Sequence, residues 1–188
     1  MNTPLLPRFS SLWVLLFVMA PGFALADDGG QKLINTKPPE WQVNGWLNSP
    51  PLTLADLKGK VVLIRWWTAP GCPYCSATAP ALNEFHEKHP GLVVIGFYHH
   101  KSDEPLSQEH VANQAERLGF KFPVAVDPEW QTLNKWWLDT GDRDFTSVSF
   151  LIDKAGRIQH IHPGGEYPKD SKDYQVMKAE IEELLKEP

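Results

Sequence analysis

The only two cysteines of this 188-residue chain, Cys72 and Cys75, lie between an apolar run and a helical pattern. The run at 58–67, KGKVVLIRWW, has the length and β-branched content of a buried strand. After the cysteines, apolar residues recur at helical spacing until His89-Pro90-Gly91 ends the pattern. A buried strand that leads into C-x-x-C at the start of a helix restricts the chain to α/β architectures.

A cysteine pair of this spacing can be a structural disulfide, a metal clamp or a reversible redox pair. A structural disulfide is the least favoured of these, because the entropy that it removes from the unfolded chain grows with the length of the closed loop. A bridge across two intervening residues closes almost no loop. The metal and redox interpretations therefore both stay open at this point.

The remaining patterns alternate between strands and helices. Strands are predicted at 91–100 and 122–128, a short helix at 130–138, and a hairpin from 148–153 and 157–162. One helix is predicted from Val111, Ala115 and Leu118, and a terminal helix from Tyr174, Met177, Ile181 and Leu184. HPGGEY at 162–167 is interpreted as a strand-ending turn, and EWQVNGWL at 40–47 as an N-terminal hairpin. The predicted fold is a mixed β-sheet flanked by helices on both faces, with that hairpin as an extension.

The first 26 residues have the pattern of a cleavable signal peptide. Arg8 precedes a short apolar core, and Ala24-Leu25-Ala26 forms a small-x-small cleavage site. A retained N-terminal anchor is the alternative, although the core is too short to span a bilayer. We expect cleavage after Ala26 and export, with the periplasm as the compartment. Residues 27–39 are predicted as a flexible lead-in and 40–188 as one domain.

Composition excludes several classes of partner. The formal net charge is −5, and such a mildly acidic chain gives no reason to expect binding to nucleic acid or to an anionic membrane. Apart from the N-terminal segment, the sequence does not suggest an integral membrane protein. The chain without residues 1–26 is long enough for a single domain with a full hydrophobic core.

Three motifs together resemble the TlpA/ResA-type branch of thioredoxin-like redoxins. They are LTLADLKGKVVLIRWW, then CPYCSATAP with Pro80 five residues after the second cysteine, then SFLIDKAGRI, in the family's order and spacing. The resemblance implies a thioredoxin-like fold, thiol-disulfide oxidoreductase activity without a bound cofactor, and exported partner proteins that carry thiols or disulfides. It also implies a redox donor in the membrane.

The chain departs from that family at three positions. Gly71 precedes the first cysteine where the family has tryptophan, and Arg65 lies near the place of a buried acidic residue. Ser147 occupies the place of a cis-proline. Because a cis bond before another residue costs about 3–4 kcal/mol, we expect the Thr146–Ser147 bond to be trans and the loop facing the thiols to differ.

The predicted mechanism depends on the start of the helix. Cys72 at the N-cap would face unpaired backbone N–H groups and the positive end of the helix dipole, with Pro73 tolerated in the first turn. Cys72 is therefore the candidate nucleophile and Cys75 the more buried resolving thiol. No cation lies within the motif, so a moderate pKa shift is expected, and a potential within about −270 to −120 mV.

Specific residues also bear on three other functions, namely metal binding, peroxidase chemistry and partner binding without catalysis. A copper-type metal site would use His99 and His100, or His160 and His162, which share a strand face. Without a metal, the first pair is interpreted as a solvated strand end and the second as part of an exposed sheet face. Peroxidase chemistry is disfavoured because neither cysteine has the Pro-x-x-x-Thr/Ser-x-x-Cys context of peroxiredoxins. A non-catalytic binding module stays open. In either case, Tyr74 and Trp67 are the first candidates for an apolar lip that contacts partners, with Thr146 and Ser147 in the facing loop.

Overall fold

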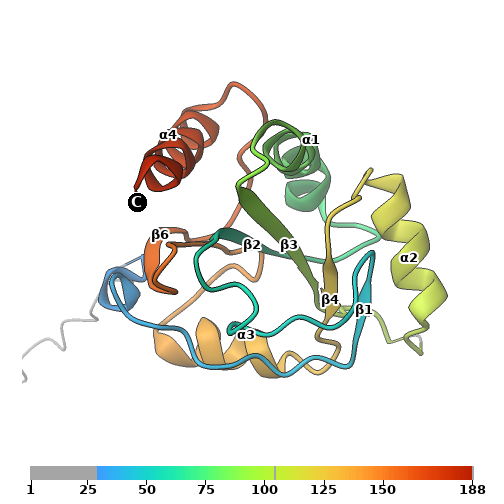
Figure 1. Cartoon of the computed structure of the whole chain (residues 1–188). Coiled ribbons are helices and arrows are strands. Elements are labelled where there is room, and N and C mark those ends of the chain that lie inside the picture. Colours follow the sequence, from blue (N-terminus) through green and yellow to red (C-terminus); the bar gives the residue numbers. More distant parts are fainter. Residues whose placement is uncertain (1–28, 104, 188) are drawn as a thin grey trace, which may run out of the picture.

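A computed structural model describes residues 29–103 and 105–187 of the protein. The predicted signal peptide lies outside the described residues. One sheet of six strands forms the centre, in the order β1-β4-β3-β2-β5-β6 (Figure 1). The strands are β1 Gly45–Leu47, β2 Val61–Trp67, β3 Leu92–Tyr98, β4 Val124–Val126, β5 Ser149–Ile152 and β6 Ile158–His162.

The sheet is parallel at its centre and antiparallel at both edges. Strand β3 runs parallel to β2 and to β4, whereas β5 pairs antiparallel with β2, β6 with β5, and β1 with β4. This mixed sheet agrees with the predicted fold class, and the 148–162 hairpin is confirmed as β5 and β6. The predicted N-terminal hairpin is wrong. Residues 45–47 form a lone edge strand on β4, so the segment gains its partner from the tertiary fold rather than from its neighbours.

Helices cover both faces of the sheet, as predicted. They are α1 Pro73–Lys88, α2 Gln108–Arg117, α3 Gln131–Trp136 and α4 Lys172–Lys186, with short 3-10 turns at Gln31–Leu33 and Leu138–Thr140. Helices α1 and α4 lie on one face and α3 on the other (Figure 1). Within the described residues, none of the helices has the length and apolar character needed to cross a membrane.

Strand β2 is buried along its whole length because it contributes to two cores. Val61, Leu63 and Trp67 pack with α1, α2 and α4, while the alternate residues Val62, Ile64 and Trp66 pack on the α3 side. A strand covered on both faces appears as a continuous apolar run in the sequence. Arg65 interrupts that run and points to the α1 side, since side chains alternate along a strand.

Part of the segment expected as a flexible lead-in contacts the sheet. Asn35 donates its backbone N–H to the Ile158 carbonyl at 2.7 Å, and Ile158 donates to the Thr36 carbonyl at 2.9 Å. Gly30 approaches so closely that a Cβ atom there would lie 2.8 Å from the Ile161 side chain. Residues before 40 therefore contact β6 of the sheet.

Candidate active site

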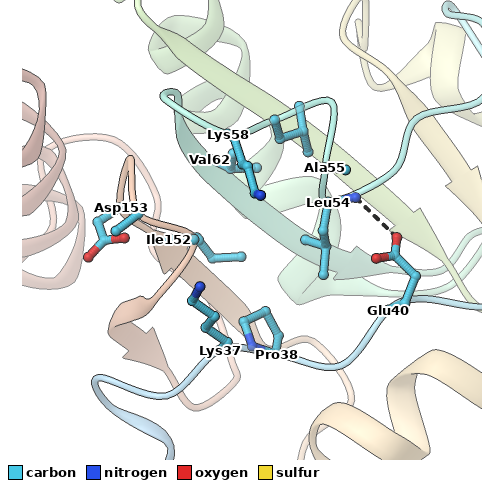
Figure 2. A pocket seen from close by; sticks show the side chains of 12 residues that line it. Lys37, Pro38, Glu40, Leu54, Ala55, Lys58, Val62, Ile152 and Asp153 are labelled. Atoms are coloured by element: carbon cyan, nitrogen blue, oxygen red, sulfur yellow. Dashed lines mark hydrogen bonds between the residues drawn. The ribbon is translucent and has the colours of Figure 1, made fainter.

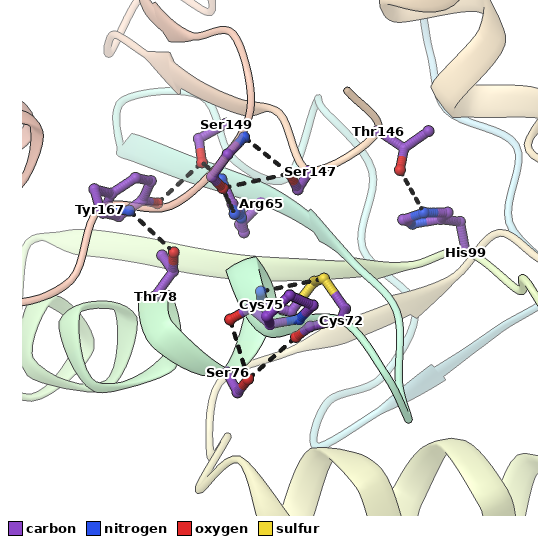
Figure 3. The surroundings of a disulfide bond; sticks show 12 residues. Arg65, Cys72, Cys75, Ser76, Thr78, His99, Thr146, Ser147, Ser149 and Tyr167 are labelled. Atoms are coloured by element: carbon purple, nitrogen blue, oxygen red, sulfur yellow. Dashed lines mark hydrogen bonds between the residues drawn. A yellow bond between two sulfur atoms is a disulfide. The ribbon is translucent and has the colours of Figure 1, made fainter. Parts of the chain in front are cut away.

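The two cysteines form a disulfide at the start of α1, with their Cα atoms 5.3 Å apart. Cys72 is the N-cap residue, in an extended conformation, and its Sγ accepts the Cys75 backbone N–H at 3.2 Å (Figure 3). Pro73 occupies the first helical position, where its missing N–H leaves no hydrogen bond unmade. The predicted placement of the sulfur at the helix N-terminus is therefore observed.

The two sulfurs differ in exposure. Cys72 is half-buried, whereas Cys75 is 3% exposed and belongs to the core between α1 and the sheet. A pocket of about 200 Å³ opens beside them, between the loop at 68–71 and one side of α2 that carries Gln114 and Arg117. Both cysteines line this pocket, and Cys72 is the more exposed of the two.

The loop facing the disulfide has the predicted trans bond. The only cis peptide bond among the described residues is Ala69–Pro70, so Thr146–Ser147 is trans. Ser147 is buried, its hydroxyl accepting the Gly165 N–H at 3.1 Å and lying 3.3 Å from the Gly165 carbonyl. Thr146 is half-buried and its hydroxyl lies 3.0 Å from His99 Nε2. Ser147 thus faces inward, and of the two residues only Thr146 retains exposure for a partner.

Of the two aromatic residues predicted to lie exposed beside the cysteines, only Tyr74 is exposed. Tyr74 is 41% exposed and meets Phe145, also 41% exposed, edge to face at 5.7 Å between ring centroids. Trp67 was expected to share this lip, but it is 1% exposed and packs between Tyr98 and Phe120. Its ring belongs to the core cluster between β2 and α1, so Trp67 is a core residue. The exposed aromatic residue beside Tyr74 is Phe145.

Two of the histidines predicted as possible metal ligands are buried against aromatic side chains. His99 was interpreted as a solvated strand end, yet it is fully buried, edge to face with Trp130. His162 was interpreted as part of an exposed face, yet it is 8% exposed, against Tyr167 and 3.5 Å from Asp173. In the two described segments of the chain, no three His, Cys, Asp or Glu residues lie together as a metal site would require.

Burial of His99 makes folding sensitive to acid. Burial, and then the charge of Lys101, lower the pKa of His99 from 6.5 to about 3. Between these two pH values, His99 is protonated in the unfolded chain and neutral in the folded protein. The free energy of unfolding is therefore highest above pH 6.5 and declines below it. We expect the unfolding free energy to fall by up to about 1.4 kcal/mol per pH unit in this window. In urea titrations at pH 7 and pH 4.5, His99→Gln should show a smaller decline, and equal declines would contradict the assignment.

Behind the disulfide, the interior residue Arg65 is 1% exposed and holds a polar cluster together. Its guanidinium donates to the Gly165 carbonyl at 2.6 Å and to the Ser149 hydroxyl at 3.3 Å. The Ser149 hydroxyl also lies 2.9 Å from the Tyr167 hydroxyl, and Tyr167 donates its N–H to Thr78 of α1 at 3.2 Å (Figure 3). The cluster thus connects β2, β5, the turn at 162–167 and the helix that carries the cysteines.

Sequence reasoning noted Arg65 and the turn but missed Ser149 and Tyr167. A signal was present, because Ser149 is a hydroxyl residue in the apolar run VSFLID and is the strand partner of Arg65. Two polar interruptions in neighbouring buried strands indicate a shared polar contact. Tyr167 had no comparable signal.

A second pocket lies away from the disulfide and does not share its residues. It has about 230 Å³ and is lined by the β5–β6 turn and by Lys37, Pro38, Glu40, Leu54, Ala55, Leu57 and Lys58 (Figure 2). Both of its lysines are exposed, and Glu40 accepts the Leu54 N–H at 3.0 Å. Nothing in this pocket carries redox chemistry.

A mixed sheet of this order with a cysteine pair capping α1 defines the class of thioredoxin-like thiol-disulfide oxidoreductases. The Redoxin family model matches residues 39–178, and the chain belongs to that family. The similarity therefore spans the whole sheet, the disulfide and the turn at 162–167.

Individual relatives agree with this class. The chain is 32% identical over 165 residues to Protein DipZ of Mycobacterium tuberculosis, covering 84% of this chain but 22% of that protein. It is 28% identical over 156 residues to the thiol-disulfide oxidoreductase ResA of Bacillus anthracis, covering 80% of this chain and 83% of that protein. A crystal structure of a thioredoxin-like superfamily protein is 30% identical, with a TM-score of 0.65, covering 81% of this chain and 97% of that one. The chain thus spans about a fifth of DipZ and most of ResA.

Proposed function

We propose that this protein is exported and exchanges disulfides with partner proteins, with Cys72 as the nucleophile and Cys75 as the resolving thiol. The observation that carries the proposal is the asymmetry of the pair, with residue Cys72 half-buried at the helix N-terminus and residue Cys75 3% exposed. Export is supported by the signal-peptide pattern of residues 1–26. The periplasm is the compartment proposed, with a membrane redox protein as the source or acceptor of electrons.

The exchange proceeds in two steps that balance. In the reducing direction, the Cys72 thiolate attacks one sulfur of a partner disulfide, forms a mixed disulfide and expels the partner's other sulfur as a thiolate. The Cys75 thiolate then attacks Cys72 Sγ, which closes the Cys72–Cys75 bond and releases the second partner sulfur. The partner gains two electrons and this protein loses two. No cofactor takes part.

The helix start lowers the barrier to the first step. The thiolate is the nucleophile, and a sulfur at a helix N-terminus is stabilised as an anion by the helix dipole and by N–H donors. The Cys75 N–H already points at Cys72 Sγ in the oxidised form. The exposed Tyr74–Phe145 pair and half-buried Thr146 surround this side of the site and are the proposed contacts for a partner chain.

Reduction of insulin disulfides by dithiothreitol tests the activity. We expect the wild-type protein to accelerate insulin precipitation in catalytic amounts and Cys72→Ser to fall to the rate of dithiothreitol alone. Lys37→Ala, a surface change in the remote pocket, should retain the wild-type rate. Acceleration that survives Cys72→Ser would contradict the proposal and favour a binding module whose cysteines are idle.

A further inference from the structure

Arg65 is a buried cation whose charge is not neutralised by an acidic side chain. Of its nitrogens, one donates to a hydroxyl and one to a backbone carbonyl, while Nε has no partner. The Tyr167 ring lies 5.2 Å from its Cζ, a cation–π distance. Within residues 29–103 and 105–187, no carboxylate pairs with it. Burying an ion without a counter-charge costs several kcal/mol, so the site of this charge requires an explanation.

The charge lies on the same face of the sheet as Cys75. Arg65 alternates along β2 with Leu63 and Trp67, which pack in one core cluster with Cys75. From the other side, Thr78 lies one helical turn after Cys75 and accepts the N–H of Tyr167, the residue whose ring contacts Arg65. Figure 3 draws Arg65, Thr78 and Tyr167 among the surroundings of the disulfide.

Of the other titratable groups facing this region, the Asp173 carboxylate is 58% exposed and lies 3.5 Å from His162, and the buried ones are neutral. His99 and His162 are held neutral by burial, and the charge of Arg65 contributes to lowering the pKa of each. Burial raises the pKa of Tyr167 and of Tyr98, which keeps both phenols protonated. The disulfide supplies the other groups that can become anions on this face, and when it opens the more buried of its two thiols is Cys75.

We propose that Arg65 is a positioning residue for the redox pair, whose fixed positive charge stabilises the Cys75 thiolate and makes the disulfide easier to reduce. The inference rests on the proposed function and adds a direction to it. A thiolate of a dithiol partner attacks Cys72 Sγ, the Cys72–Cys75 bond breaks, and Cys75 leaves as the thiolate on the face of the sheet that carries Arg65. The partner's second thiolate then attacks its own sulfur in the mixed disulfide and releases Cys72. The partner is oxidised to a disulfide, and this protein accepts its two electrons.

The consequence is a bias toward oxidation of dithiol partners. A thiol with a lower pKa is the better leaving group, so opening of the bond is accelerated, and a stabilised thiolate favours the reduced form at equilibrium. A buried opposite charge on the same face lowers the pKa of a thiol, and each pKa unit corresponds to about tenfold in the equilibrium. A neutral residue at position 65 should remove this bias.

The test measures the redox equilibrium with glutathione in wild type, Arg65→Met and Arg65→Lys, with thiols quantified by alkylation and mass spectrometry. We expect Arg65→Met to shift the equilibrium constant about tenfold toward the disulfide, or about 30 mV, and Arg65→Lys to stay within threefold of wild type. Folding of each variant is checked by its thermal transition. A folded Arg65→Met protein within twofold of wild type would overturn the proposal.

A second measurement does not require Arg65→Met to fold. In Cys72→Ser the only thiol left is Cys75, and burial alone would raise its pKa above the ordinary value of about 8.5. We expect titration of the thiolate absorbance to give a value below 8.5, and a value at or above it would overturn the proposal. Neither readout depends on catalysis, so an inactive protein in the insulin assay would refute the proposed function without deciding the role of Arg65.

Discussion

Cys75→Ser is expected to accumulate a covalent adduct with a substrate disulfide, whereas Cys72→Ser should not. In the reduced Cys75→Ser protein, Cys72 can still attack a disulfide from the helix N-terminus, but no second thiol is left to release the product. In Cys72→Ser the remaining sulfur, Cys75, is 3% exposed in the core cluster and does not meet the substrate. The asymmetry in burial therefore predicts an asymmetry in trapping.

The adduct is measured by mixing each reduced variant with insulin and recording intact masses without reductant. We expect at least tenfold more adduct for Cys75→Ser than for Cys72→Ser, and its loss on addition of dithiothreitol. Wild-type protein serves as the control, since its resolving thiol clears the intermediate. Equal trapping by the two variants would show that the sulfurs are equally accessible and would remove the assigned roles.

Phe85→Ala is expected to cost about 3–5 kcal/mol of unfolding free energy. Phe85 is fully buried in the core between α1 and the sheet, and its ring stacks on that of Tyr174 at 5.1 Å with an interplanar angle of 6°. Truncation removes the buried ring and leaves a cavity where α1 meets α4. Because α1 carries both cysteines, the loss is expected to loosen the helix that holds the site.

Urea unfolding of the oxidised proteins measures this cost. Phe85→Leu keeps most of the volume and should lose less than half as much, since the size of the cavity governs the cost. Phe145→Ala is the matched aromatic control, because that ring is 41% exposed and surface truncations change stability by about 0.5 kcal/mol or less. A loss below about 1 kcal/mol for Phe85→Ala would mean that the α1–α4 contact does not hold the core together.

Features that depend on nearby residues were predictable from the sequence. The start of α1 at Cys72-Pro73 follows from the N-terminal preference of proline and was found as expected. The hairpin at 148–162 was also found, because its two strands are joined by a short turn. The same local logic failed for residues 40–47, where an edge strand is completed by β4 from far along the chain.

Burial of individual side chains was less predictable. Trp67 and His99 both stand at the end of an apolar run, where a strand normally emerges into solvent, and both are buried here. Phe120 packs on the first and Trp130 on the second. These covering residues belong to later segments, so exposure at a strand end depends on contacts that no local pattern contains.

The amino-acid sequence by itself determined where the Cys72 sulfur lies, because a helix N-terminus is set by residues within one turn of it. Only the tertiary structure decided which charge lies on the same face of the sheet as the second cysteine, Cys75. Arg65 is held by Ser149 and Gly165, which are 84 and 100 residues further along the chain. Electrostatic interaction depends on distance in space and on burial, and neither quantity follows from spacing in the sequence.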